Sequence, residues 1–444
     1  KKSLDQVLDA AFISYISRPL SQAAVRALYG QKLENSVTTL ENYSSCAYAH
    51  FLQYGLCLSQ REENKIQTPD LGIILHRALE LFAAGLKAGN YTWKDVPEDV
   101  REELSRDCAV EAAKGFNHTI LLETKRNQYQ IQRLVRYVLR TTWAIKQQLG
   151  RGDFLPESFE IRFDSDALDG LTDVMIGQDG LMKLKGTIDR IDVCEVGDNL
   201  YVKIVDYKSG SQKFDIVELY HGLSLQLVVY MNAARALEEK THPGKKVIPA
   251  GILYYNIDDP MIQRDDFENM ENEDAREKLM EDVLLKLKCN GLVNGSPEVI
   301  RLFDRDFTKD SSVIPVSMTA SGALSKRSQT ASAAQFDALG DFASKKVESL
   351  GAEILAGKIP VNPYIRGTKS ACTYCLFRSV CGFDERIDGF SYRRLSGMSA
   401  DDAWKAIFEW NEIHGENKVR PKSEKSVETM ENREVDDHGE PMDR

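Results

Sequence analysis

The sequence predicts a mixed α/β fold in which a central mixed sheet is flanked by helices on both faces. Two observations lead to this fold class. Residues 36–149 have helical spacing, and strand-like runs follow at 158–163, 182–193, 200–208 and 247–255. The chain between the last two runs has the period of an amphipathic helix, at about 216–237. Strands that lie between helices in this way are typical of an α/β core.

Local signals place the first helices. Residues 1–35 carry Leu, Val, Ile and Ala three and four positions apart. Ser36 is a capping residue for the next helix, which we expect to continue through Cys46 to about Gln53. A helix at 71–86 is strongly apolar on one side and carries His76. A third helix is predicted at about 125–149.

The C-terminal half predicts a loop, a long helix and a tail. Residues 316–334 are rich in Ser, Thr and Ala and read as a loop, whereas 335–357 read as a helix that ends in glycine. We expect a helical lead-in from an upstream domain at 1–35, a main domain at 36–393, and a C-terminal helix with a disordered charged tail at 394–444.

Charge and hydropathy narrow the class of protein. The net charge of −11 argues at first against a nucleic-acid partner, but residues 258–282 alone hold eleven acidic and three basic residues. The remainder is nearly balanced and can carry a basic groove. No apolar run is long enough for a membrane helix, and no secretory signal opens the chain. We therefore expect a cytoplasmic protein without a membrane partner, and the start without Met indicates a fragment.

The most informative stretch is a predicted β-hairpin. Gly197 and Asp198 suit a two-residue loop between the runs 182–193 and 200–208. This loop places Asp189 directly opposite Asp206, with Cβ atoms roughly 4.5–5.5 Å apart. Lys208 lies two residues beyond Asp206 and so projects from the same face. One hairpin therefore brings two carboxylates and an ammonium group together.

This trio suits the hydrolysis of phosphodiesters. Two carboxylates can hold a Mg²⁺ ion, which lowers the pKa of a bound water and polarises a phosphoryl oxygen. Lys208 can orient the attacking water or offset charge on phosphorus, and the carbonyl of Tyr207 is a further candidate metal ligand. An isolated Asp-x-Lys would more often be an exposed polar face. Here Asp206 follows an apolar run that reads as interior, where unpaired charge is costly.

A basic stripe is a candidate nucleic-acid contact. Arg133, Arg136 and Arg140, together with Tyr129, follow one side of the predicted helix at 125–149. Such a stripe suits phosphates and base stacking. A solvated basic face explains the same spacing equally well.

Three cysteines are clustered near the C-terminus. Cys372, Cys375 and Cys381 lie within ten residues, in a chain too long for a disulfide scaffold. Metal or cluster ligation is the natural reading in a reducing compartment. Their spacing alone allows a zinc ion as well as an iron–sulfur cluster.

Six motifs in this order give the chain a family resemblance. The motifs are Ser36-Val37-Thr38-Thr39-Leu40-Glu41-Asn42-Tyr43 leading to Cys46; Gly72-x3-His76-x2-Leu79-Glu80; Gly186-x-Ile188-Asp189-Arg190-Ile191-Asp192; Asp206-Tyr207-Lys208-Ser209-Gly210; Gln226-x3-Tyr230; and Ala371-Cys372-x2-Cys375-x5-Cys381. With these motifs the chain resembles the RecB-like branch of the PD-(D/E)XK nucleases, and within it the C-terminal nuclease domain of AddB-type helicase/deoxyribonuclease subunits.

The resemblance implies roles for particular residues. The two acids of the hairpin match the metal-binding acids and its lysine matches the catalytic lysine, with Mg²⁺ or Mn²⁺ as the metal. His76 matches a histidine that joins the metal site, and Glu160 is a weaker candidate. Gln226 and Tyr230 match a motif beside the active site and are counted with the catalytic residues.

The resemblance also implies an iron–sulfur staple. Cys46 matches the first ligand of a [4Fe–4S] cluster, whose other ligands would be Cys372, Cys375 and Cys381. Such a cluster would join the N- and C-terminal parts of a restriction-endonuclease-like core. Closing so long a loop should stabilise the fold rather than support redox chemistry.

The expected function is metal-dependent cleavage of DNA. The resemblance implies an exonuclease that acts on single strands from unwound double-strand ends, beside an AddA-type helicase/nuclease partner, in recombinational repair. The chain has no Gly-x4-Gly-Lys-Ser/Thr phosphate loop, so the motor must lie elsewhere. The alternatives are a catalytically silent module that binds DNA ends and a stand-alone RecB-like exonuclease.

Overall fold

The computed structural model describes residues 14–61, 68–116, 125–163, 168, 170, 173–176, 180–262, 272–305, 307–395 and 397–415. The expected charged tail after residue 415 lies outside these residues, as does the first part of the expected helical lead-in.

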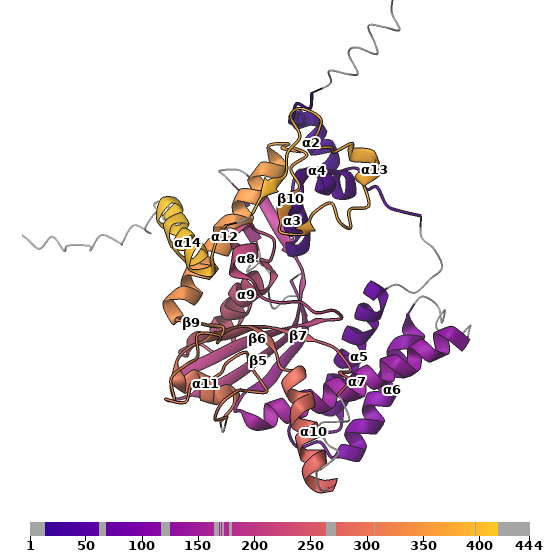
Figure 1. Ribbon diagram of the computed structural model, residues 1–444, viewed down its shortest axis with the longest axis vertical. Coiled ribbons are helices and arrows are strands. Elements are labelled where there is room, and N and C mark those ends of the chain that lie inside the picture. Colours follow the sequence, from indigo (N-terminus) through magenta and orange to yellow (C-terminus); the bar gives the residue numbers. More distant parts are fainter. Residues whose placement is uncertain are drawn as a thin grey trace, which may run out of the picture.

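A six-stranded mixed sheet forms the centre of the molecule (Figure 1). Antiparallel pairs join β2 to β5, β5 to β6 and β7 to β8, whereas β6–β7 and β8–β9 are parallel. The predicted mixed sheet is therefore confirmed. In spatial order its strands are β2 (Leu155–Arg162), β5 (Thr187–Val196), β6 (Asn199–Lys208), β7 (Lys246–Asn256), β8 (Asn290–Asn294) and β9 (Thr330–Ala331).

Helices cover both faces of this sheet, as expected (Figure 1). Strand β6 shows why, because Val202 and Ile204 pack into one apolar core whereas Tyr201 and Val205 pack into the other. None of the described helices is long and apolar enough to cross a membrane. The first core includes α3 (Val37–Ser45), α8 (Ile216–Tyr220), α9 (Gln226–Thr241), α12 (Ala333–Leu355) and α14 (Ala400–Gly415); the second includes α5 (Thr68–Ala88), α6 (Glu98–Gly115), α7 (Lys125–Arg151), α10 (Asn272–Lys286) and α11 (Pro297–Phe303).

Two small sheets complete the fold. One joins β1, β4 and β3, and the other lies around the clustered cysteines and joins β11, β10 and β12. The remaining elements are α2 (Gln22–Tyr29), β1 (Leu33–Ser36), α4 (Ala47–His50), the π-helix η1 (Phe51–Gly55), β3 (Asp173–Ile176), β4 (Gly180–Lys185), β10 (Tyr364–Arg366), β11 (Lys369–Ser370), α13 (Arg378–Cys381) and β12 (Arg393–Arg394).

The strand expected at 182–193 is two strands of different sheets, β4 and β5. The break falls at Gly186, where a Cβ atom would lie 3.2 Å from the hydroxyl of Tyr230. The missing side chain at Gly186 thus makes room for a side chain of α9. Sequence periodicity could not reveal a contact between residues so far apart.

The single helix expected at 216–237 is also divided, into α8 and α9. Between them Gly222 has a φ of +77°, and a Cβ atom there would lie 2.6 Å from Oγ of Ser44. The break lets α9 begin at Gln226, one of the predicted site residues.

Two predictions near the N-terminus need correction. The expected helical lead-in at 1–35 contains a helix at α2, but Leu33–Ser36 form strand β1, which pairs with β4. The helix that begins after the Ser36 cap ends at Ser45, because Cys46 is extended with a φ of −161°. That extended residue separates α3 from α4.

The structure predicts that Gly291→Ala weakens the fold. Gly291 lies in β8 with a φ of +156°, and a Cβ atom would lie 2.1 Å from the carbonyl oxygen of Ile252. We expect the free energy of unfolding to fall by about 3 kcal/mol, since backbone cannot move aside cheaply. Gly150→Ala, in helix α7 with open space around it, is the control and should not destabilise. Equal urea midpoints for the two variants would contradict the steric reading.

Candidate active site

The β5–β6 hairpin has the predicted register. Its pairs run from Val196–Asn199 to Arg190–Val205 around a turn in which Gly197 has a φ of +59°. The ladder ends at Arg190–Val205, and the same register continued by one step corresponds to Asp189 opposite Asp206. Both carboxylates are buried, with residue exposures of 6% and 2%. The turn read from the sequence therefore brings these two acids to one end of the hairpin.

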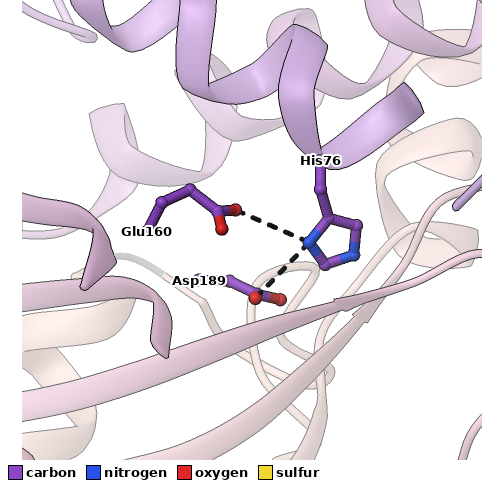
Figure 2. A group of neighbouring side chains, drawn as sticks. All are labelled: His76, Glu160 and Asp189. Carbon is purple, nitrogen blue, oxygen red and sulfur yellow. Dashed lines mark ion pairs between the residues drawn. The ribbon is translucent and has the colours of Figure 1, made fainter. Parts of the chain in front are cut away.

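His76 of α5 approaches this end from the helical layer. Its Nδ1 lies 3.4 Å from Oδ1 of Asp189 and 3.6 Å from Oε1 of Glu160. Figure 2 shows the ring nitrogen facing both carboxylates, which come from two neighbouring strands. One atom from each of the three residues can be chosen so that all lie within 4.8 Å of one another. One histidine and two carboxylates in this arrangement can hold a divalent cation.

Glu160 reaches this group through unusual backbone. Its φ is +49°, in the left-handed region that residues with a Cβ atom seldom adopt. It lies in β2 between Phe159 and Ile161, which pair with Arg190 and Ile188 of β5. The weaker candidate from the sequence is therefore placed beside Asp189.

The backbone of Tyr207 contacts both sides of the site. Its N–H donates to Oδ2 of Asp189 over 2.7 Å, and its carbonyl oxygen lies 2.9 Å from Nε2 of His76. The carbonyl that the sequence suggested as a ligand thus lies beside the donor group. The backbone of Tyr207 therefore orients Asp189 through its N–H group and His76 through its carbonyl oxygen.

A chain of polar contacts leads from Asp206 into helix α9. Lys208 Nζ lies 2.6 Å from Oδ2 of Asp206 and donates to Oε1 of Gln226 over 3.0 Å. Gln226 Nε2 in turn donates to the hydroxyl of Tyr230, also over 3.0 Å. The ammonium group of Lys208 therefore lies against Asp206. Gln226 fixes its position, and Tyr230 in turn fixes Gln226.

The acids, the lysine, the histidine and Gln226 line one open cleft of about 490 Å³. His76, Glu160, Asp189, Asp206 and Lys208 all contribute to its wall. Glu80 lines it too, but its carboxylate pairs with Arg77 at 2.5 Å and not with His76. Charged groups beneath an open cleft are accessible to a polar substrate.

Negative charge dominates the electrostatics of the cleft. Burial and the charge of Asp189 raise the pKa of Asp206 to about 7, against the opposing effect of Lys208. Burial lowers the pKa of His76, but hydrogen bonds and charge from Asp189 and Glu160 outweigh it and raise the pKa to about 10. Burial also raises the pKa of Glu160. A divalent cation held by these oxygens would compete with the same protons.

Glu41 of α3 is a site residue whose role the sequence did not reveal. Its carboxylate accepts hydrogen bonds from the backbone N–H groups of Leu225 (2.6 Å) and Gln226 (3.0 Å), at the start of α9. Burial raises its pKa to about 7. Glu41 belongs to the motif at 36–43, but its hydrogen-bond partners lie more than 180 residues away in the sequence. Only the fold shows that it fixes the backbone of Gln226.

The predicted basic stripe lies on α7, away from the cleft. Arg136 and Arg140 approach Asp259, at 3.9 and 3.4 Å, and Arg133 donates to the hydroxyl of Tyr137. None of the three arginines lines the cleft that holds His76. Asp259 therefore offsets part of the positive charge of Arg136 and Arg140, which the sequence suggested as phosphate contacts.

The four predicted cysteine ligands line one apolar cavity. Cys46 comes from the junction of α3 and α4, and Cys372, Cys375 and Cys381 come from the C-terminal segment. The other lining residues include Leu52, Val361, Phe377 and Phe383. All four thiols are free. The fold therefore brings together sulfur atoms from segments more than 300 residues apart.

A second group of two acids and a histidine lies at the end of α9. His242 Nδ1 is 3.0 Å from Glu238, while its Nε2 is 3.8 Å from Glu157 of β2. The ring thus lies between the two carboxylates, with one nitrogen toward each. This arrangement differs from the group around His76, where one nitrogen faces both acids.

Comparisons with known proteins agree with the geometry of the cleft. The family model described as PD-(D/E)XK nuclease superfamily matches residues 34–382, a range that holds every cleft residue and all four cysteines. The chain is 39% identical over 94% of its length to a subunit of the ATP-dependent helicase/deoxyribonuclease of Lachnoclostridium phytofermentans. Proteins of the same description from Clostridium kluyveri and Thermoanaerobacter sp. are 33% and 30% identical, over 94% and 92% of this chain. The chain spans about a third (35%) of the length of these relatives.

The contacts of Glu41 yield a stability prediction. Glu41→Ala removes the acceptor for two N–H groups, so we expect the free energy of unfolding to fall by about 2 kcal/mol. Glu41→Gln keeps a carbonyl oxygen in place and is the matched control, expected within about 0.5 kcal/mol of wild type. Urea unfolding at pH 7 measures both. A Glu41→Ala variant as stable as Glu41→Gln would show that the capping contacts are unimportant.

Proposed function

This chain belongs to the PD-(D/E)XK nuclease superfamily, and from that membership we propose that it is a metal-dependent deoxyribonuclease that hydrolyses phosphodiester bonds. One observation carries the proposal. Asp189, Asp206, Lys208 and His76 come from three separate elements and converge on a single open cleft. A purely structural ion-pair cluster has no need of such access from solvent.

The donor set fits a hard divalent cation. Asp189, Asp206, His76, Glu160 and the carbonyl of Tyr207 are the groups that would hold Mg²⁺ or Mn²⁺, since carboxylate and carbonyl oxygens are the ligands these ions prefer. The ion supplies a lowered pKa for a bound water and polarisation of a phosphoryl oxygen. The raised pKa of His76 supports the assignment, because hydrogen bonds and negative charge from Asp189 and Glu160 favour a positive charge at this position despite burial.

Lys208 has the role of the catalytic lysine in this proposal. Its ammonium group can donate to the attacking water and offset negative charge that grows on the phosphoryl oxygens. The contacts with Asp206 and Gln226 restrict where the ammonium can point. Gln226 and Tyr230 therefore act on the reaction by holding Lys208.

We also propose that the chain is the nuclease domain of a larger helicase–nuclease complex. The names of its relatives describe one subunit of an ATP-dependent helicase/deoxyribonuclease, and the chain corresponds to about a third of each. The substrate would be single strands from unwound DNA ends, delivered by an AddA-type partner for recombinational repair. Arg133, Arg136 and Arg140 are secondary candidates for phosphate contacts outside the cleft.

The cysteine cavity supports a [4Fe–4S] cluster on Cys46, Cys372, Cys375 and Cys381. All four thiols are free and line one apolar cavity, which is the ligand set that the family resemblance implies for the cluster. The cluster would fasten the start of the domain to its end.

Substitution of Asp206 tests the catalytic proposal. Asp206→Asn removes a charged metal-binding oxygen at nearly constant volume, so we expect kcat on labelled single-stranded DNA with Mg²⁺ to fall by about 1,000-fold. Asp337→Asn is the control, because Asp337 is an exposed acid of α12 that pairs with Arg235. Cleavage by Asp206→Asn at the wild-type rate, or no Mg²⁺-dependent cleavage by wild type, would favour the silent DNA-binding module.

Substitution of Cys375 tests the cluster. Anaerobically purified wild type should absorb broadly near 400 nm and contain about four irons per chain. Cys375→Ser should lose this absorbance and melt at a lower temperature, whereas Cys57→Ser, at an exposed cysteine outside the cavity, should keep both properties. One zinc ion per wild-type chain, without the absorbance, would replace the cluster by a zinc site.

A further inference from the structure

A buried charged network lies on the opposite face of the hairpin from the two acids. Arg190 and Asp192 of β5 join Lys203 of β6, and none of the three is more than 5% exposed. Arg190 Nε and Nη2 lie 2.8 and 3.0 Å from the two oxygens of Asp192, and Lys203 Nζ lies 3.1 Å from the second oxygen. Lys203 also lies over the rings of Phe154 and Phe303, at 4.6 and 5.1 Å.

Burial of this network costs desolvation free energy. Two cations and one carboxylate are removed from water, and well-packed apolar residues often serve stability equally well or better. The excess positive charge makes the desolvation cost larger. Stability alone therefore gives no reason to place these residues behind the cleft.

The network reaches the cleft through Tyr207. Arg190 Nη1 donates to the hydroxyl of Tyr207 over 2.9 Å. The side chain of Tyr207 is 2% exposed on that face, while its N–H and carbonyl contact Asp189 and His76 at the cleft. A hydrogen bond that fixes the ring consequently restricts the backbone groups that orient two metal-site side chains.

We propose that Arg190, held by Asp192, which Lys203 also contacts, is a positioning residue that acts through Tyr207 to set the geometry of the metal site. The inference rests on the proposed function, because it assigns no new chemistry to the cleft. It adds that the metal affinity of the site is determined partly by charges on the far side of the sheet. Groups hydrogen-bonded directly to metal ligands commonly change metal affinity about 10- to 100-fold when they are removed, and Tyr207 is such a group for Asp189 and His76.

Two tyrosine variants separate positioning from stability. Tyr207→Phe removes the acceptor for Arg190 and leaves the ring and backbone. Tyr255→Phe is the matched control, because Tyr255 is the strand partner of Tyr207 on β7, equally buried, with ring centroids 5.9 Å apart. In the part of the chain described, its hydroxyl is not bonded to Arg190. A merely structural role for the bond between Arg190 and Tyr207 would lower the urea midpoint of Tyr207→Phe and leave its Mn²⁺ affinity unchanged.

The readouts are Mn²⁺ affinity without DNA, the Mg²⁺ concentration for half-maximal cleavage, and urea unfolding. We expect Tyr207→Phe to weaken Mn²⁺ binding and raise the Mg²⁺ midpoint by about tenfold, and Tyr255→Phe to change both less than about twofold. Arg190→Lys keeps the charge but not the forked geometry, and should act like Tyr207→Phe. If Tyr207→Phe does not fold, the Mn²⁺ affinity of Arg190→Lys tests the positioning role in its place.

Equal shifts in the two tyrosine variants would overturn the inference, as would an unchanged Mn²⁺ affinity in Tyr207→Phe. A wild-type chain that binds no Mn²⁺ would overturn it too, since there would be no site to position. Tight Mn²⁺ binding by wild type without any DNA cleavage would instead refute the proposed nuclease and leave the Mn²⁺ comparison decisive for the positioning role.

Discussion

Repulsion between Asp189 and Asp206 is the interaction to which the surrounding residues respond. The hairpin register forces two buried carboxylates to share one end of a two-stranded ladder. Lys208 approaches one of them and His76 the other, and a backbone N–H supplies a further donor to Asp189. Burial, and after it the charge of Asp189, raises the pKa of Asp206 despite Lys208. Two buried acids that disfavour each other's charge are suited to a cation that arrives from solvent.

Helix α3 connects this site to the cysteine cavity. Glu41, on one turn, caps α9 beside Gln226, while the helix ends one residue before Cys46. Hydrogen bonds fasten the same region to the C-terminal segment, from Tyr43 to the carbonyl of Lys358 and from Ala47 N–H to Asn362. The segments at 43–47 and 358–362 are therefore joined directly, and a cluster bound between the cysteines would reinforce contacts that already exist.

The sequence predicted those parts of the site that depend on local pairing. A two-residue turn is sufficient to place Asp189 opposite Asp206, because a hairpin ladder is fixed by its turn. The break at Gly186 and the role of Glu41 were not predictable in this way, since each depends on a contact with α9 that only the folded chain creates. The arginine stripe was visible, but its neutralising partner Asp259 lies more than 100 residues away. Local periodicity therefore located the acids, whereas their supports required tertiary structure.

The left-handed backbone at Glu160 has a consequence for association between molecules. Strand β2 is at the edge of the main sheet, where unpaired backbone groups invite another chain to add a strand. The bulge between Pro156 and Ser158, followed by the positive φ of Glu160, interrupts the regular outer edge within a few residues. The same distortion that directs an acid into the cleft thus protects the sheet against edge-to-edge aggregation.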